Sequence, residues 1–268
     1  MRVAVLTNRD VESCLALNLL HRALGARIAA VFVSERVGGR SAASRALEPL
    51  SFVEQDFFNQ YVFPAVERTP PDGRSLTFAE FERVHGIPVR TLGSARTPEA
   101  LEALRAARAD LFVSIRFGHI LGDDAIAIAP RGVLNLHSGL LPQYRGVIAT
   151  FRALLNGDHE IGCTLHWIDS PNIDAGAIIE TPRVSVDRTR SLLWHVLALY
   201  PPGMDAMARA VLALEAGHEL PSVPQVGEGG AYYSFPTDED IARFTAAGWR
   251  LFGRDDVTSL VAHFAPSA

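Results

Sequence analysis

Three side chains with complementary chemistry lie in the middle of the chain. Asn135 and His137 occupy alternate positions of the segment VLNLH, and Asp174 follows further along, two residues before a glycine. An amide can donate a hydrogen bond to an oxyanion, and an imidazole can polarise a carbonyl or carry a proton. A carboxylate can orient the imidazole and accept a proton. These are the three groups needed to pass an acyl group to an amine.

Each of these residues also has a structural interpretation. Asn135 could cap a turn and Asp174 could lie in a surface turn, because Asn and Asp often bond neighbouring backbone. A lone histidine such as His137 is usually structural. Their combination favours catalysis for all three. His166, in the alternating run GCTLHWI, is expected at a sheet edge or at the rim of the site, and it is the first alternative for acid–base work.

The segments around these residues resemble the folate-dependent formyltransferases. That family has the patterns Asn-x-His, Leu-Leu-Pro-x-Tyr-Arg-Gly, Asn-Gly-Asp/Glu, Gly-x-Thr-x-His and Asp-x-Gly. The chain carries them as NLH at 135–137, LLPQYRG at 140–146, NGD at 156–158, GCTLH at 162–166 and DAG at 174–176. The match is specific from about residue 110 to residue 180, and a weaker match in pattern extends back to residue 1.

The resemblance implies 10-formyltetrahydrofolate as the co-substrate, an amine as the acceptor, and catalytic roles for Asn135, His137 and Asp174. It also implies a folate-binding set, with the loop after the fourth strand lining the pterin pocket. That set is Arg116, Phe117, Gly118, His119, Ile120, Leu121, Leu141 and Pro142. Arg116 could instead contact an anionic substrate or be a solvated cation. The turn after His137 reads Ser-Gly where many relatives have Pro-Ser.

Composition excludes several other chemistries. All 25 basic residues are Arg, so a Schiff-base lysine and a phosphate-loop lysine are excluded. No G-x-G-x-x-G follows the first apolar run, which argues against a nicotinamide dinucleotide. The nine histidines lack a metal-ligand spacing and the two cysteines, Cys14 and Cys163, form no thiolate site, so no metal is predicted. Cys163 is expected to be a buried packing residue.

Charge and hydropathy limit the partners and the compartment that we expect for the protein. The net charge of −5 argues against broad nucleic-acid binding, which needs clustered cations. No apolar run approaches the roughly 18 residues of a membrane span. The start of the chain lacks the layout of a signal peptide, so we expect a cytoplasmic protein.

The elements that would position the site alternate between short apolar runs and amphipathic stretches. This pattern predicts an α/β fold, a Rossmann-like open, mostly parallel twisted sheet with helices on both faces. The expected strands are 2–6, 28–33, 89–92, 111–114, 133–134, 162–168 and 177–179. The expected helices are 10–23, 78–85, 98–107, 123–128, 150–155 and 191–217, the last interrupted by the Pro-Pro-Gly run at 201–203. Asn135 and His137 would lie just after the carboxyl end of a strand, where α/β sheets bind ligands.

Two regions depart from this alternation. Residues 35–75 hold an aromatic helix that could pack on the sheet edge, or form a lid or a wall of the acceptor pocket. The pattern predicts a catalytic domain over 1–216 and, over 217–268, a linker and a small C-terminal appendage. Aromatic side chains there could dock on the core or on the second subunit of a homodimer.

The acceptor is the open question. The 217–268 segment has seven acidic residues and three Arg, a poor balance for tRNA, and the loop TNRDVE after the first strand lacks the glycine of the glycinamide ribonucleotide enzymes. These features favour an amino sugar, either free or nucleotide-linked, or a modified amino acid. A methionyl-tRNA formyltransferase-like enzyme and a formyltetrahydrofolate hydrolase remain alternatives. A non-enzymatic folate-binding module is least favoured, because it needs no catalytic trio.

Overall fold

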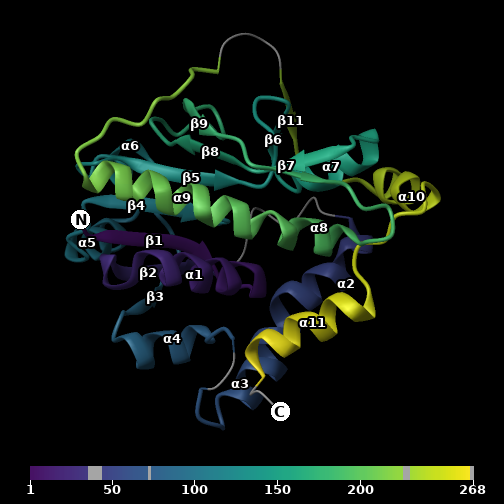
Figure 1. The fold of residues 1–268 in the computed structure, drawn as a ribbon, viewed down its shortest axis with the longest axis horizontal. Helices are drawn as coiled ribbons and strands as arrows, with labels where there is room; N and C mark the ends of the chain where they lie inside the picture. The colour runs from purple at the N-terminus through teal and green to yellow at the C-terminus, as the bar shows by residue number, and fades with distance from the viewer. Residues whose placement is uncertain (36–43, 72–73, 226–229, 266–268) are drawn as a thin grey trace.

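The structure, a computed structural model, describes residues 1–35, 44–71, 74–225 and 230–265. A seven-stranded sheet lies at its centre, in the order β3-β2-β1-β4-β5-β8-β9 (Figure 1). The first five strands are parallel, and β8 and β9 are each antiparallel to the strand before them in that order. The strands are β1 Val3–Asn8, β2 Ile28–Ser34, β3 Val89–Thr91, β4 Leu111–Ile115, β5 Val133–His137, β8 Thr164–Trp167 and β9 Ile178–Glu180. The predicted fold class is confirmed.

Alternate residues of each strand feed two separate hydrophobic cores. In β1, Val3 and Val5 belong to one core, while Ala4 and Leu6 belong to the other. This alternation arises because successive side chains of a strand point to opposite faces of the sheet. Different helices pack on the two faces. Those lying directly on the strands include α1 Val11–Leu24, α8 Leu192–Ala198 and α9 Tyr200–Glu215 on one side, and α5 Pro98–Ala106 and α6 Asp123–Ile126 on the other.

A helical run follows the first two strands, and it includes a long π-helical stretch. Its parts are the 3-10 turn η3 Arg45–Leu47, α2 Glu48–Ser51, the π-helix η4 Phe52–Val62 and α3 Phe63–Val66, and α4 Phe78–His85 comes after it. Phe58 and Phe63 are buried in the first core. Residues 36–43 and 72–73 of the predicted insertion lie outside the described residues. The run therefore packs on the core, and its first part also lines the cavity described below.

Three boundaries differ from the expectation. β5 extends through His137, so Asn135 and His137 lie inside the strand and not after its end. The predicted strand 162–168 is divided into two strands, β7 Glu160–Gly162 and β8. Cys163 lies between them, and its N–H donates to the carbonyl of Pro182. The helical stretch expected over 191–217, with an interruption at 201–203, is interrupted two residues earlier, at Leu199. Its prolines lie in the first turn of α9, where a missing N–H costs nothing.

The chain beyond α9 returns across the sheet and packs on the rest of the molecule (Figure 1). β11 pairs in parallel with β6, Phe244 stacks on Phe151 with ring centroids 4.4 Å apart, and Phe264 packs edge-on against Phe58 and Phe63. The remaining elements are η1 Gly25–Arg27, β6 Tyr144–Gly146, α7 Ala149–Asn156, β10 Arg183–Ser185, β11 Ala231–Tyr233, α10 Asp238–Ala246 and α11 Arg254–Phe264.

Candidate active site

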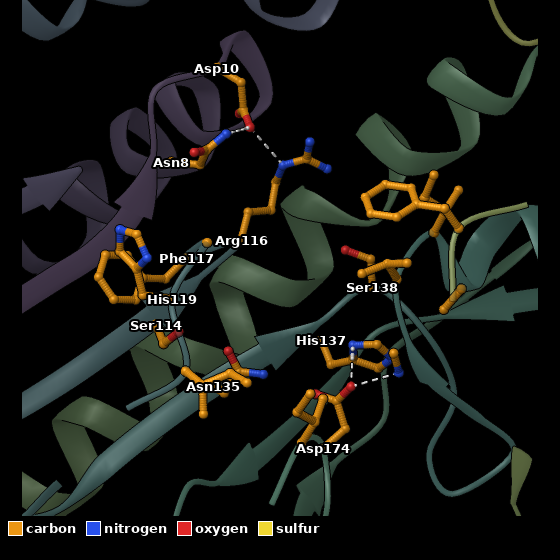
Figure 2. A pocket seen from close by; sticks show the side chains of 18 of the residues that line it. Asn8, Asp10, Ser114, Arg116, Phe117, His119, Asn135, His137, Ser138 and Asp174 are labelled. Carbon is orange, nitrogen blue, oxygen red and sulfur yellow. Dashed lines mark hydrogen bonds and ion pairs between the residues drawn. The ribbon is translucent and has the colours of Figure 1, made fainter. Parts of the chain in front are cut away.

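A cavity of about 1180 Å³ opens beside the carboxyl ends of the parallel strands. Its walls come from the segments that follow β1 and β4, from β5 and β8, from the loop between β8 and β9, and from α2 and η4. Figure 2 shows Asn135, His137 and Asp174 on one part of its wall and Asn8, Asp10 and Arg116 on another. All three residues predicted to be catalytic line this cavity.

Asn135 and His137 reach the cavity from one strand. They lie two positions apart in β5, so their side chains emerge on the same face of the sheet. The Asn135 amide Nδ2 donates to Nε2 of His166, 2.9 Å away. His137 is buried, and its Nε2–H donates to the carbonyl of Tyr144 at 2.6 Å. These bonds fix both side chains, and they leave Nδ1 of His137 directed at Asp174.

Asp174 lies in the loop between β8 and β9 and joins two imidazoles. Its Oδ2 lies 3.5 Å from Nδ1 of His137, and its Oδ1 lies 3.7 Å from Nε2 of His166. The backbone N–H of Gly146 also donates to Oδ2, at 2.9 Å. Figure 2 shows the His137 ring and the Asp174 carboxylate pointing toward one another. One carboxylate therefore couples both histidines.

The pKa of Asp174 is low despite its burial. Burial by itself raises the pKa of this carboxyl, but the charge of His137 and the contacts from His166 and Gly146 outweigh it and lower the pKa to about 2. Asp174 is therefore ionised throughout the physiological range. Because Nε2 of His137 already carries the proton donated to Tyr144, a second proton on Nδ1 makes the ring a cation paired with Asp174.

His166 is the residue that sequence reasoning undervalued. It is 1% exposed, and it lies opposite Asn135 in the antiparallel pair of β5 and β8. Its Nδ1–H donates to the carbonyl of Trp167 at 2.8 Å, so its Nε2 accepts from Asn135. The sequence signal was the histidine of the Gly-x-Thr-x-His pattern, on the face of β8 that Thr164 shares. The rim position that we expected is wrong, because the ring is buried inside the cluster.

Arg116 forms ion pairs with three carboxylates. Its guanidinium lies 3.1 Å from Asp10 and 3.8 Å from Glu54, and it also pairs with Glu12. Burial opposes charge on Arg116, but Asp10 and Glu12 raise its pKa well above the ordinary value. The side chain is only 20% exposed. Arg116 lines the cavity, but as part of a buried ion network and not as a solvated cation.

The loop after Arg116 forms an apolar wall. Phe117 contacts His119 edge-on with ring centroids 5.3 Å apart, and Ile120 is 47% exposed beside the cavity. Gly118 donates its N–H to Ser34, and His119 bonds the carbonyl of Leu92 through Nε2. These bonds hold the loop, and residues 117–121 all line the cavity.

Two residues of the predicted folate-binding set lie elsewhere. Leu141 and Pro142 are not among the residues that line the cavity. The N–H of Leu141 donates to the hydroxyl of Thr164 at 3.0 Å, and its side chain is buried. These two residues therefore hold the turn after β5 and do not form a wall of the pocket. Their contact with folate stays a prediction.

Arg96 is a cavity residue that sequence reasoning missed. It lies after β3, and its Nε donates to the carbonyl of Ile120 at 3.4 Å, next to the apolar loop. Nothing in its local sequence distinguishes it from the other arginines. Within the described ranges, no group of three or more His, Cys, Asp or Glu side chains has the arrangement of a metal site. No helix in those ranges has the length and apolar character of a membrane span.

The sequence is similar to those of known formyltransferases. The family model described as formyl transferase matches residues 1–193. The methionyl-tRNA formyltransferase of Symbiobacterium thermophilum is 36% identical over 166 residues, which is 60% of this chain and 50% of that protein. The enzyme of the same name from Moorella thermoacetica is 40% identical over 169 residues, or 62% and 51%. The chain thus matches about half the length of these relatives.

Solved structures with the same fold include enzymes with smaller acceptors. An N-formyltransferase from Helicobacter canadensis, solved with folinic acid and dTDP-3-aminofucose, has a TM-score of 0.55 at 14% identity, over 100% of this chain and 84% of that one. The phosphoribosylglycinamide formyltransferase of Anaplasma phagocytophilum has a TM-score of 0.57 at 20% identity, over 88% and 98%. At these identities the likeness concerns the fold alone.

Proposed function

Because the chain belongs to the formyl transferase family, we propose that it transfers the formyl group of 10-formyltetrahydrofolate to the amine of a small molecule. The acceptor is an amino sugar, free or nucleotide-linked, or a modified amino acid. The observation that carries this proposal is the cluster of Asn135, His137 and Asp174 on the wall of one large cavity.

The cluster supplies what formyl transfer to an amine requires. The amine nitrogen attacks the formyl carbon, the bond from that carbon to the donor nitrogen breaks, and one proton passes from the amine to that nitrogen. The second N–H of the Asn135 amide, beside the one given to His166, stabilises the oxyanion together with the charge on His137. Asp174 orients His137 and accepts the amine proton, directly or through water.

The donor fits the opposite part of the cavity. The loop with Phe117 and Ile120 offers an apolar surface to a flat ring system, and Arg96 next to it offers a cation to the carboxylates of the folate tail. The exposed position of Ile120 leaves this surface open to a ligand. Arg116 is less suited to the tail, since Asp10 and Glu12 already neutralise it.

The first-strand end of the cavity disfavours a phosphate. A helix N-terminus can bind a phosphate through its free N–H groups. Here the Asp10 carboxylate accepts from the N–H of Ser13 at 2.7 Å and from the Asn8 amide at 2.7 Å, so a carboxylate already occupies the start of α1. An acceptor phosphate at this position would meet like charge. This favours an acceptor whose phosphates, where it has any, bind elsewhere.

The alternative acceptor is initiator methionyl-tRNA, which the names of the curated relatives favour. The experiment incubates the protein with 10-formyltetrahydrofolate and, in separate arms, pools of amino sugars and amino acids, methionyl-tRNA, or no acceptor. We expect the mass gain of one CO on a small amine and little release of tetrahydrofolate without one. Faster formylation of methionyl-tRNA would overturn the acceptor class, and equal release in every arm would indicate a hydrolase.

A further inference from the structure

The backbone at Asp174 is held from outside its own loop. The backbone φ of Asp174 is 51°, in the left-handed region that residues other than glycine seldom adopt. The side-chain Nε2 of Gln225 donates to the carbonyl of Asp174 at 2.9 Å and to the carbonyl of Gly176 at 2.7 Å. An amide nitrogen has two hydrogens, so Gln225 commits both of them to this turn.

Gln225 also closes a ring of hydrogen bonds around the carboxylate. Its Oε1 accepts from the guanidinium of Arg145 at 3.3 Å. The residue after Arg145 is Gly146, whose N–H donates to Oδ2 of Asp174 at 2.9 Å. The backbone carbonyl and the side-chain carboxylate of Asp174 are thus tied to the same short strand, β6. The ring sets both the position and the direction of the carboxylate.

The segment that carries Gln225 is anchored on both sides of it. Val223 exchanges two backbone hydrogen bonds with Ile178 of β9, each 2.8 Å long. Beyond residues 226–229, which lie outside the described residues, Tyr233 of β11 pairs with Gly146. That contact is close, since a Cβ on Gly146 would lie 2.2 Å from the carbonyl oxygen of Tyr233. Val223, Gln225 and β11 lie beyond residue 193, where the family match ends, while their partners in β6 and β9 lie within it.

We propose that Gln225 is a positioning residue that directs the Asp174 carboxylate at His137 and His166. The inference rests on the proposed function for its consequence in catalysis. The carboxylate lies 3.5 and 3.7 Å from the two rings, so a displacement of the turn would change both contacts at once. Gln225 itself is not among the residues that line the cavity, and it acts through Asp174. The segment after α9 is in this way part of the catalytic apparatus.

The test compares Gln225→Glu and Gln225→Leu with wild type. Gln225→Glu keeps the acceptor for Arg145, but it removes both donors and sets a carboxylate against two carbonyls. Gln225→Leu removes the bonds without adding charge. We expect kcat to fall by roughly 10- to 100-fold in both, as for a misplaced catalytic group, with the KM for the folate donor unchanged. The acidic limb of the kcat profile should move to higher pH, because the displaced Asp174 loses the contacts that lower its pKa.

A second readout needs no turnover. Nitrogen NMR of the His137 and His166 imidazoles, followed against pH, should differ from wild type in both variants. Gln60→Glu is the matched control, since that amide lies on the surface and bonds Asp56. Wild-type kcat and wild-type histidine titration in folded variants would overturn the proposal. So would the unfolding of both variants, which would make Gln225 a residue of the fold. A wild-type protein inactive on every acceptor would refute the proposed function, and the histidine titration would still decide the role of Gln225.

Discussion

Replacing Asp174 by Asn removes one charge and keeps the shape of the side chain. The Asn oxygen can still accept from the N–H of Gly146, as Oδ2 does now. The amide nitrogen then faces Nε2 of His166, which already accepts from Asn135. His137 loses the carboxylate that favours a proton on its Nδ1. The variant should therefore fold, bind the folate donor almost normally, and fail in the chemical step.

The expected loss can be estimated from the structure. The pKa of about 2, against an ordinary 3.8, shows that the site favours the ionised carboxylate. Since one pKa unit is about 1.4 kcal/mol, the preference is about 2 to 3 kcal/mol, or roughly 60-fold in rate if all of it acts in the transition state. Loss of proton acceptance alone costs about 10²- to 10⁴-fold. We expect a loss of turnover near the upper end of that second range.

Single-turnover formyl transfer measures the chemical step, donor titration measures folate binding, and thermal unfolding measures folding. Asp169→Asn is the matched control, because Asp169 is an exposed carboxylate in the same loop. It should retain wild-type turnover. A folded Asp174→Asn protein that keeps more than about a tenth of wild-type turnover, against the range expected for acid–base groups, would refute the assignment and direct attention to His166.

Four further outcomes follow from the same geometry. His166→Ala should lower kcat by about 10²-fold, because it releases Asn135 and leaves Asp174 with one ring; unchanged single-turnover rates would refute this. Cys163→Ala should keep turnover, since burial raises its thiol pKa to about 12 and only the unreactive thiol is present; a folded, inactive variant would contradict it. Arg96→Gln should raise the donor KM a few-fold with kcat unchanged, measured by steady-state kinetics at low salt; an unaltered donor KM would show that Arg96 does not contact the folate tail. The pKa of Asp174 is lower in the folded protein than in the unfolded chain, so the ionised carboxylate stabilises the fold fully above about pH 4 and loses this effect as the pH falls to about 2. Chemical denaturation should show that the free energy of unfolding falls less over this pH interval in Asp174→Asn than in wild type; an equal fall in both proteins would contradict the assignment.

The framework of the fold was predictable because its signals are local. The buried parallel strands are almost continuous apolar runs, and Asp10, Thr77 and Thr97 cap helices at the positions that their sequence suggests. The catalytic candidates were found in the same way, from motifs within short segments. Apolar periodicity does not say where a strand stops, however, and β5 continues through His137.

The rest of the site depends on pairings between distant segments. His166 joins the cluster only because β8 runs antiparallel beside β5 in a register that sets it opposite Asn135. Arg116 pairs with Asp10, 106 residues earlier, and Gln225 bonds a turn 51 residues before it. A register slip of one residue between β5 and β8 would send His166 to the other face of the sheet. Such contacts follow from the packed fold and leave no signal in the local sequence.

The π-helix η4 makes the cavity wall sensitive to the length of the chain as well as to its composition. Ser51, Glu54 and Gln55, at and just inside its start, face the cavity, while Phe58 and Val62 lie in the core. A π-helical turn holds more residues than an α-helical one, so deleting a residue here can restore ordinary helix without breaking it. Each residue of an α-helix turns the chain by about 100°, and a deletion would therefore rotate the side chains after it by about that angle relative to those before it. Loss or gain of a single residue in this stretch would therefore change which side chains face the cavity and leave β5 untouched.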